Sequence, residues 1–464
     1  MFGAIGDRCS LWESLLPQEV LRLPEELARV DALLDDPVFY VLFAPFFDPL
    51  TGRPSTPVEC CLRLMFLMFC YRLGYESLCA EVSDSITWRR FCRIPLDGKV
   101  PHPTTLMKLT SRCGEDAVAG LNEALWAKAA ASKLLRTARV RAGTMVIPAS
   151  VASPTGSGLL AKAVGKLVRT VQRVQAAGGA IRTVMADRRR AAARRVRKIA
   201  SKLRTRGKLG REESTPAIRR VTGELADLAD KATAGAAAVL RNGRRALPTA
   251  VSGRVRGRLA RALAELAITI ERTGQVVAQT RTRLAGQTPQ SAARLVSLHD
   301  PDARPIRKGR IDRPVEFGDK AQVADNDDGI IPGYSLEYGA APDGPQLAPA
   351  MERIRRRAGR VPRAVTADRG YGQPPVERDL QALGVRMIAI PRQAKIPPAR
   401  KTTEHSRSFR RLVKWRTGSE GRISYLKRGH GWDRTRLDGS QGATIWCGHG
   451  VLAHNLVKIG ALAS

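Results

Sequence analysis

The chain has 464 residues, of which 43% are hydrophobic, so it can form two or three domains with buried cores. Its formal charge of +35 and pI near 10.9 favour a polyanionic partner, above all nucleic acid, although an anionic membrane surface would also attract it. No apolar run reaches the roughly 18 residues that a membrane-spanning helix needs. The N-terminus lacks the pattern of a secretory signal, so we expect a soluble, cytoplasmic protein.

Eight cysteines are present, but no pair has the C-x-x-C spacing of a zinc ribbon and no histidine cluster completes a metal site. Cys60, Cys61, Cys70 and Cys79 fall in apolar helical stretches, where free cysteine behaves as a small hydrophobic residue. We expect all eight to be reduced and structural.

Residues 1–130 are predicted to form an all-helical, DNA-binding domain. Pro57–Leu73 is apolar at helical spacing and is followed by Gly74, and a second helix is predicted over Ser77–Ser85. Short helices joined by tight turns are typical of helix-turn-helix DNA readers. The arginines that we expect to contact DNA are Arg63, Arg72, Arg89 and Arg90. The alternative is a helical packing domain whose arginines are only solvated.

The pattern changes between Arg139 and Leu160. Arg139–Ile147 is predicted to be a strand, and a loop from Ser153 leads into a helix. No Asp or Glu occurs between Glu123 and Asp187, so neither the strand nor the loop offers a carboxylate.

Residues 166–294 are rich in Ala and Arg and are predicted to form a helical insertion, with helices over Ala180–Leu203 and Arg254–Leu284. Between residues 161 and 298, 31 Lys and Arg stand against 8 Asp and Glu, a formal charge of +23. Like charges at this density weaken a helix bundle, and a bound polyanion would relieve the repulsion. We expect a stripe of arginines that follows DNA phosphates; the alternative is a solvated helical hairpin. The stripe consists of Arg241, Arg244, Arg245, Arg254, Arg256 and Arg258.

The part after residue 295 has a mixed α/β pattern. Val315–Ala324 and Ile330–Tyr338 are predicted strands of a hairpin joined by the turn Asp325–Gly329. Its aspartates resemble the start of a calcium loop, but Leu336 stands where the bidentate acid is due, so we favour a turn.

A short apolar strand, Ala364–Ala367, ends at Asp368 and is followed by Gly370 and Gly372. Open α/β sheets bind ligands at the C-terminal ends of such strands. The alternative for Asp368 is a helix N-cap or a turn residue. The other predicted elements make this a mixed sheet flanked by helices. They are helices over Pro345–Gly359 and Arg378–Leu383, a strand over Val385–Ile390, and helices over Trp415–Lys427 and Thr444–Gly460.

A second carboxylate, Glu420, lies about fifty residues further on in a basic segment that includes Arg416, Arg422 and Lys427. An acid among basic residues suggests a divalent cation beside a polyanion.

With these pieces placed, the sequence resembles the DDE transposases of bacterial insertion sequences. The resemblance rests on the helical region 57–110, the second-acid strand Thr366–Tyr371, and the spacing R-x3-E-x6-K of Arg416, Glu420 and Lys427. The Tyr usually found three residues before the Arg is Val413 here. The resemblance implies a ribonuclease-H-like core, formed by residues 138–165 and 295–464 and interrupted by the helical insertion.

In this family two Asp and one Glu hold two Mg²⁺ (or Mn²⁺) ions, about 3.5–4 Å apart, for DNA strand cleavage and transfer. The resemblance implies that Asp368 and Glu420 are metal ligands and that Arg416 and Lys427 face the scissile phosphate. Arg422 is expected to contact DNA. The implied partners are double-stranded DNA, at the element ends and the target, and a second copy of the chain in a homodimer. The implied location is the bacterial cytoplasm, with the protein bound to nucleoid DNA.

The first acidic position of the family has no acid in this chain. The Asp before the Thr of the opening strand falls on Gly143, and a further acid of the next loop falls on Gly156. Asp319 and Asp325 are the nearest later acids outside the insertion and its flank, but we place them on a hairpin that points away from the site. We therefore expect retained DNA binding with impaired cleavage.

Two other hypotheses are a transposase-derived DNA-binding protein that does not cleave, and a basic protein that compacts nucleic acid. The spacing of Arg416, Glu420 and Lys427 argues against the last, because compaction needs no carboxylate there.

Overall fold

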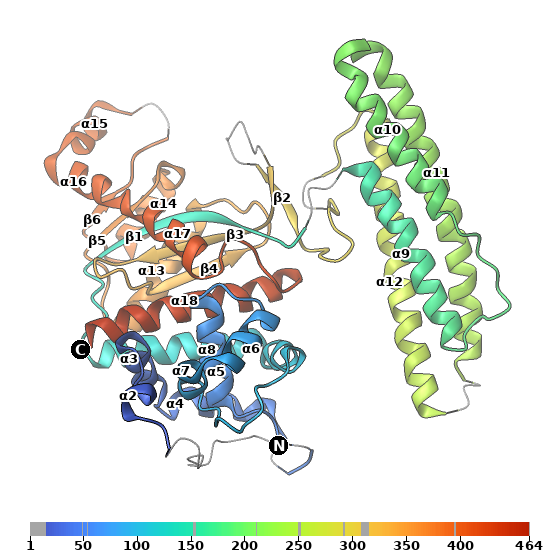
Figure 1. Ribbon diagram of the computed structural model, residues 1–464. Coiled ribbons are helices and arrows are strands. Elements are labelled where there is room, and N and C mark those ends of the chain that lie inside the picture. The colour runs from blue at the N-terminus through green and yellow to red at the C-terminus, as the bar shows by residue number, and fades with distance from the viewer. Residues whose placement is uncertain are drawn as a thin grey trace. The chain divides into compact units, whose positions relative to one another are not determined.

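The computed structural model describes residues 15–48, 50–52, 54–151, 155–209, 211–248, 252–290, 293–307, 315–393 and 396–463, without the side chains of residues 205–214. The chain divides into two compact units (Figure 1). Unit 1 consists of Met1–Ser150 and Gly318–Ser464, and unit 2 of Val151–Phe317. The second unit thus begins before and ends after the 166–294 range expected for the insertion.

Unit 1 begins with short helices that lead to one long helix. The predicted helices at 57–73 and 77–85 are confirmed as α5 and α6, with ends shifted by one to three residues. The elements are α2 (Gln18–Leu21), α3 (Glu25–Leu34), α4 (Val38–Val41), η1 (Ala44–Phe46), α5 (Val58–Cys70), α6 (Tyr75–Asp84), α7 (Ile86–Phe91) and α8 (Pro103–Ala131).

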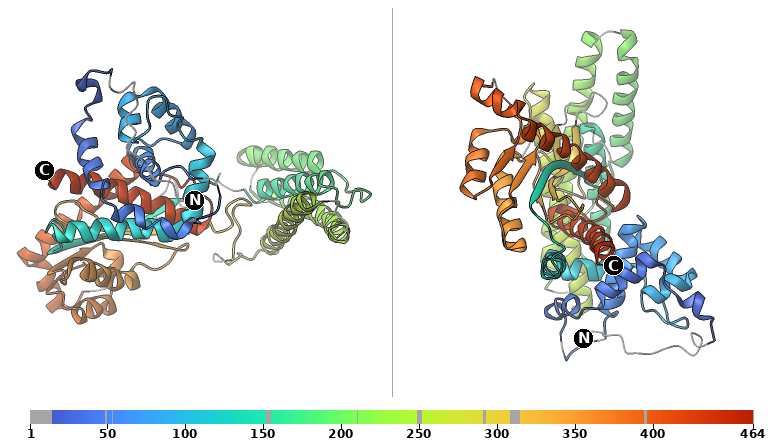
Figure 2. Two further views of the ribbon diagram at one scale, coloured as in Figure 1. Left: turned by 90° about the horizontal axis from the view of Figure 1, so that it is seen from below. Right: turned by 90° about the vertical axis from the view of Figure 1, so that its left-hand side faces the viewer.

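These helices share a hydrophobic core with the C-terminal helix α18 (Gly439–Leu462). Residues on every side of α18 are buried, among them Trp446, Cys447 and Val451, as expected for a helix that is apolar all round. Figures 1 and 2 show α8 and α18 side by side. The described residues up to 130, which we treated as a separate domain, therefore lie in the same unit as most of the sheet; only β2 and the first three residues of β3 belong to unit 2.

The sheet has the strand order β2-β3-β1-β5-β6, with β4 paired to β3. β1 is antiparallel to β3 and parallel to β5, β5 is parallel to β6, and β3 and β4 form the predicted hairpin. This mixed sheet agrees with the predicted ribonuclease-H-like core. The strands are β1 (Arg139–Pro148), β2 (Arg304–Arg307), β3 (Val315–Asp325), β4 (Gly333–Glu337), β5 (Ala364–Ala367) and β6 (Met387–Ala389).

Helices cover the sheet because alternate strand residues are apolar. Val140, Ala142, Val365 and Ala367 pack against α13 and α14 on one face. On the other face Gly143 lies beneath α17. The helices that follow the hairpin are α13 (Gly344–Ala358), η2 (Arg369–Tyr371), α14 (Pro374–Ala382), α15 (Pro398–His405), α16 (Arg407–Arg416) and α17 (Gly418–Gly429).

Unit 2 contains a bundle of long helices (Figure 2) packed around Ala, Leu and Val side chains. The prediction for 254–284 is confirmed by α12, whereas 180–188 is not helical and α10 begins only at Arg189. The helices are α9 (Gly156–Ala176), α10 (Arg189–Leu209), α11 (Arg211–Ala246) and α12 (Gly253–Leu284). None of the described helices of the protein is long and apolar enough to cross a membrane.

The aspartates of the β3–β4 turn form ion pairs with arginines. These arginines lie on β1 or just before it. Arg136 pairs with Asp328, Arg139 with Asp327 at 2.8 Å, and Arg141 with Asp325 at 2.7 Å. The predicted turn is present, and guanidinium groups hold its carboxylates.

The Arg141–Asp325 pair is buried, with side-chain exposures of 10% and 1%, and Arg141 also donates to the carbonyl oxygen of Trp415 at 2.8 Å. Asp325→Ala should therefore destabilise the protein by about 3–5 kcal/mol, because it leaves a buried charge without its partner. Asp327→Ala is the matched control: its pair with Arg139 is 35% and 42% exposed, and its loss should cost about 0–1 kcal/mol. Urea unfolding measures both, and equal losses would contradict this account.

Three buried histidines make the fold sensitive to acid. Burial lowers the pKa of His430 and of His449 to about 4 and the pKa of His454 well below its usual value. The unfolded chain, with a His pKa near 6.5, then binds more protons than the folded chain, so stability is full above about pH 6.5 and falls toward pH 4.

We expect the midpoint of thermal unfolding to drop steadily between pH 7 and pH 4.5. In His449→Gln the drop should be shallower, since glutamine does not titrate. The same melting temperature at both ends of this pH range would show that the histidines do not contribute.

Candidate active site at the strand ends

Asp368 lies directly after β5, as the sequence predicts, and also caps η2. Its Oδ1 accepts a hydrogen bond from the backbone N–H of Gly370 at 2.7 Å. Burial raises the pKa of Asp368, and the nearby Asp343 raises it further, while Gly370, Arg416 and Lys320 act in the opposite direction. The two interpretations of Asp368, a strand-end carboxylate and an N-cap, are thus both correct.

Asp343 is a second carboxylate beside Asp368, and no motif in the sequence indicates it. A Cβ on Gly370 would lie 2.8 Å from Oδ1 of Asp368 and 3.3 Å from Oδ2 of Asp343, so both carboxylates flank the same point. Lys320, on β3, places its Nζ 2.6 Å from Oδ1 of Asp343. The only signal in the sequence is an Asp just before the predicted helix at Pro345, which is typical of an ordinary helix start.

Arg416 and Glu420 lie on either side of the break between α16 and α17. Arg416 donates to Glu420 Oε1 at 3.3 Å, and its positive charge also lowers the pKa of Asp368. Glu420 itself is 72% exposed. Lys427 lies in the last turn of α17, about two turns from Glu420.

Gly143 is next to Asp368 in the sheet. Ala142 pairs with Ala367 in the parallel ladder, so the following residues of the two strands, Gly143 and Asp368, are neighbours. A Cβ on Gly143 would lie 2.9 Å from Ser419 Oγ and 3.2 Å from Ile423 Cδ1. Ser419 is buried and its hydroxyl has no hydrogen-bond partner among the described residues. The space above the glycine is therefore filled by α17.

The other acids considered from the sequence are Asp319 and Asp325, and the structure gives the neighbours of both. Asp325 is held by Arg141 and Arg422, and Asp319 lies opposite Ile147, several residues from Gly143 along β1. Gly156 is the first residue of α9, in unit 2.

Three of the arginines expected to contact DNA have other roles. Arg63 is fully buried and pairs with Asp31 and Asp35, each at 2.7 Å, so no surface is left for DNA. Arg89 donates to the backbone carbonyls of Ser83, Pro95, Leu96 and Gly98. Arg422 is 17% exposed and faces Asp325 at 3.4 Å. We therefore withdraw these three residues from the predicted DNA contacts.

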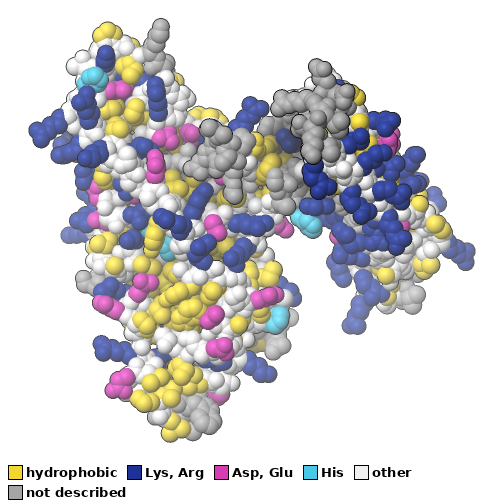
Figure 3. All heavy atoms as spheres, turned by 45° about the horizontal axis from the view of Figure 1, so that its top comes forward, with side chains coloured by type: hydrophobic (Ala, Val, Ile, Leu, Met, Phe, Trp, Pro, Cys, Tyr) yellow, Lys and Arg dark blue, Asp and Glu magenta, His cyan; other side chains and the backbone are white. Residues whose placement is uncertain are grey.

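Arg72 and Arg90 are exposed, and Arg72 forms an exposed ion pair with Asp433 at 3.1 Å. Arg254, Arg256 and Arg258 are exposed on α12, but Arg256 lies about 200° around the helix from Arg254 and donates to the carbonyl of Pro248. The single stripe that we predicted therefore cannot include Arg256. Figure 3 shows Lys and Arg side chains gathered on a face of unit 2.

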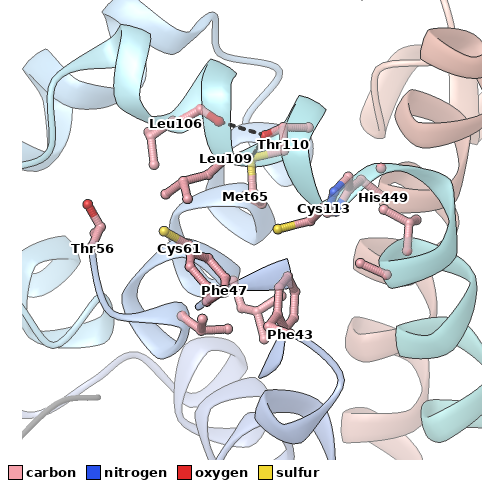
Figure 4. Close-up of a pocket in the computed structure, with 15 residues that line it drawn as sticks. Phe43, Phe47, Thr56, Cys61, Met65, Leu106, Leu109, Thr110, Cys113 and His449 are labelled. Carbon is pink, nitrogen blue, oxygen red and sulfur yellow. Dashed lines mark hydrogen bonds between the residues drawn. The ribbon is translucent and has the colours of Figure 1, made fainter. Parts of the chain in front are cut away.

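An apolar cavity of about 40 Å³ among the N-terminal helices is lined by Cys61, Met65, Cys113 and His449, together with other apolar side chains (Figure 4). Burial raises the pKa of Cys113 to about 11 and that of Cys61 well above its usual value, so neither thiol is reactive. The cavity lies where α8 kinks at Gly114, and we interpret it as a packing gap. The cysteines of the described residues are all free, as predicted.

Comparison with known families decides the identity of the chain. Residues 14–112 match a transposase domain (DUF772), and residues 303–456 match the transposase DDE domain. The second match includes Asp368, Arg416, Glu420 and Lys427.

The chain belongs to the DDE transposases of insertion sequences. No curated protein and no solved structure matches it. The DDE match begins after β1, so the strand that carries Gly143 lies outside the matched range of this transposase.

DDE transposases depend in general on divalent metal ions, so the residues must be tested for such a site. Asp368 and Asp343 face each other, but Lys320 already pairs with Asp343, and Glu420 is exposed and bound to Arg416. Among the described residues, no group of three His, Cys, Asp or Glu side chains could hold a metal ion. The residues of this transposase therefore do not fit the two-metal site of the family.

Proposed function

We propose that this transposase binds the terminal inverted repeats of an insertion sequence as double-stranded DNA, and that its strand-cleaving step is impaired by loss of the first acid. The observation that supports this best is the pair of neighbours Gly143 and Asp368. The position beside the surviving acid has no side chain, and Ser419 and Ile423 fill the space above it.

Restoring the acid requires more than one substitution. An Asp at position 143 would place its Cβ 2.9 Å from Ser419 Oγ, and its carboxylate needs further room. Ser419→Ala removes that oxygen, whose loss leaves no hydrogen bond broken among the described residues. The pair Gly143→Asp/Ser419→Ala is therefore a fairer test than Gly143→Asp alone.

We expect the unchanged protein to bind terminal-repeat DNA without cutting it in Mg²⁺ or Mn²⁺, and the double variant to gain strand cleavage. Gly143→Asn/Ser419→Ala is the matched control, because it fills the same space without a charge and should stay inactive. Cleavage is measured on labelled DNA in a denaturing gel. Cutting by the unchanged protein at the rate of the double variant would overturn the proposal.

The alternative is a transposase-derived DNA-binding protein whose site is beyond repair. It predicts that the double variant binds DNA with unchanged affinity but never cuts it. Adding Asp368→Asn to the double variant is a control for a contaminating nuclease. It should abolish any cleavage that the restored site performs, whereas cleavage by a contaminant would remain.

The DNA-binding surface that we propose lies on unit 2. Arg190, Arg194 and Arg197 are exposed at helical spacing on one side of α10, and none of them forms an ion pair with a described residue. On α12, Arg254, Arg258 and Arg261 repeat this spacing. The stretch from residue 231 to 264 contains no Asp or Glu. Such rows suit the phosphates of a duplex, which each arginine contacts by a charged hydrogen bond.

Affinity for DNA should fall steeply with salt, because each neutralised phosphate releases counterions. Replacing Arg190, Arg194 and Arg197 by Gln should lower the slope of log K against log[salt] by up to about 3, at roughly 0.9 per contact. Arg189→Gln is the control, since Arg189 already pairs with Asp187 at 2.6 Å. Fluorescence anisotropy measures both slopes, and an unchanged slope in the triple variant would exclude this face.

We also propose that two copies of the chain pair the two ends of the element. The family resemblance motivates this, and sedimentation of the protein with terminal-repeat DNA tests it. A complex with one chain on two DNA ends would be inconsistent with a homodimer.

A further inference from the structure

A hollow of about 400 Å³ lies between α8 and α13 in unit 1, away from the strand ends. Its lining consists of Glu123, Ala127, Arg353, Arg356 and Arg357. The three arginines come from one side of α13, because residues three and four positions apart share a helix face. They lie near the C-terminal end of this 15-residue helix, whereas Asp343 precedes its N-terminus, about 20 Å away.

Arg357 is held rigidly by its surroundings. Its guanidinium lies over the ring of Trp126, 3.8 Å from the centroid, and its Nη1 donates to the carbonyl oxygen of Pro332 at 2.8 Å. Its Nε donates to Glu123 at 3.0 Å. A fixed guanidinium loses little side-chain entropy when it binds an anion.

Arg353 and Arg356 have no ion pair with any described residue. Burial lowers the pKa of Arg353, and the charges of Arg357 and Arg356 lower it further, while Glu337 and Glu123 act in the opposite direction. Three guanidinium groups thus share a hollow whose lining contains one carboxylate, and that carboxylate is already bound to Arg357. The guanidinium groups of Arg353 and Arg356 are not neutralised by a carboxylate of the lining, so they repel each other. A bound anion would relieve this repulsion.

We propose that this hollow binds a phosphate-bearing anion. Guanidinium groups match the oxygens of phosphate in a forked geometry, and a phosphodiester of DNA or a free pyrophosphate would present the same oxygens. The site is separate from the Asp368 cluster, and it does not depend on the proposed DNA-binding face of unit 2.

The test uses the full chain and sodium pyrophosphate, at ionic strength matched with chloride. Pyrophosphate should raise the melting temperature of the unchanged protein, and calorimetry should give a dissociation constant that Arg353→Gln/Arg356→Gln weakens at least tenfold. The control is Arg355→Gln, on the same helix, because Arg355 pairs with Glu352 at 2.8 Å and does not line the hollow. Equal binding by the double variant and the control would overturn the proposal.

Glu123→Gln is a control for the possibility that the arginine variants lose binding only because they unfold. It removes the one carboxylate of the lining, so it should tighten pyrophosphate binding several-fold, which unfolding cannot do. Weaker or unchanged binding in this variant would contradict the site.

Competition with labelled duplex DNA then identifies the natural source of the phosphate. If the source is DNA, pyrophosphate competes with the duplex and the double variant lowers DNA affinity. If it is a free anion, DNA binding is the same in the double variant and only pyrophosphate binding is lost.

Discussion

The buried ion pair between Arg141 and Asp325 is the interaction on which the arrangement of the site depends. It joins β1 to β3, and the bond from Arg141 to the carbonyl of Trp415 ties the end of α16 to the same strand. Gly418 lies against the guanidinium of Arg141, where a Cβ would come within 2.3 Å of its Nη1. This contact fixes where α17 starts and therefore brings Ser419 over Gly143. A buried pair of this kind tolerates the loss of neither partner, because the remaining charge cannot reach water.

The charges of the side chains around Asp368, at the end of β5, largely balance one another. Asp343 and Asp368 are matched by Lys320 and Arg416, and the charges nearly cancel without a bound ion. A site built for two dications needs an excess of carboxylates, since each ion brings two positive charges. In the assignment that we propose, Gly143 stands at the first acidic position and the third acid, Glu420, is exposed, so the excess is absent. This is the physical reason for the impaired cleavage that we propose.

DNA binding and cleavage respond differently to substitution. In the DNA-binding surface that we propose, attraction between arginines and phosphates is spread over many residues of unit 2, and losing one of them changes affinity by a modest amount. Metal coordination depends on three or four ligands in one geometry, so a single missing acid removes it. A transposase that accumulates substitutions is therefore expected to lose cleavage long before it loses DNA binding.

Sequence alone determined the elements whose signals are local. Helical periodicity located α5, α6 and α12, the aspartate-rich turn located the β3–β4 hairpin, and the apolar run before Asp368 located β5. The charge and the spacing of Arg416, Glu420 and Lys427 indicated the family. Only the tertiary structure decided which charged side chains are free. Arg63 forms ion pairs with Asp31 and Asp35, and Arg422 forms one with Asp325. The carboxylate of Asp343 lies beside that of Asp368. These partners lie 25 to 97 residues apart in the chain, and periodicity shows which face of an element is apolar but not what packs against it.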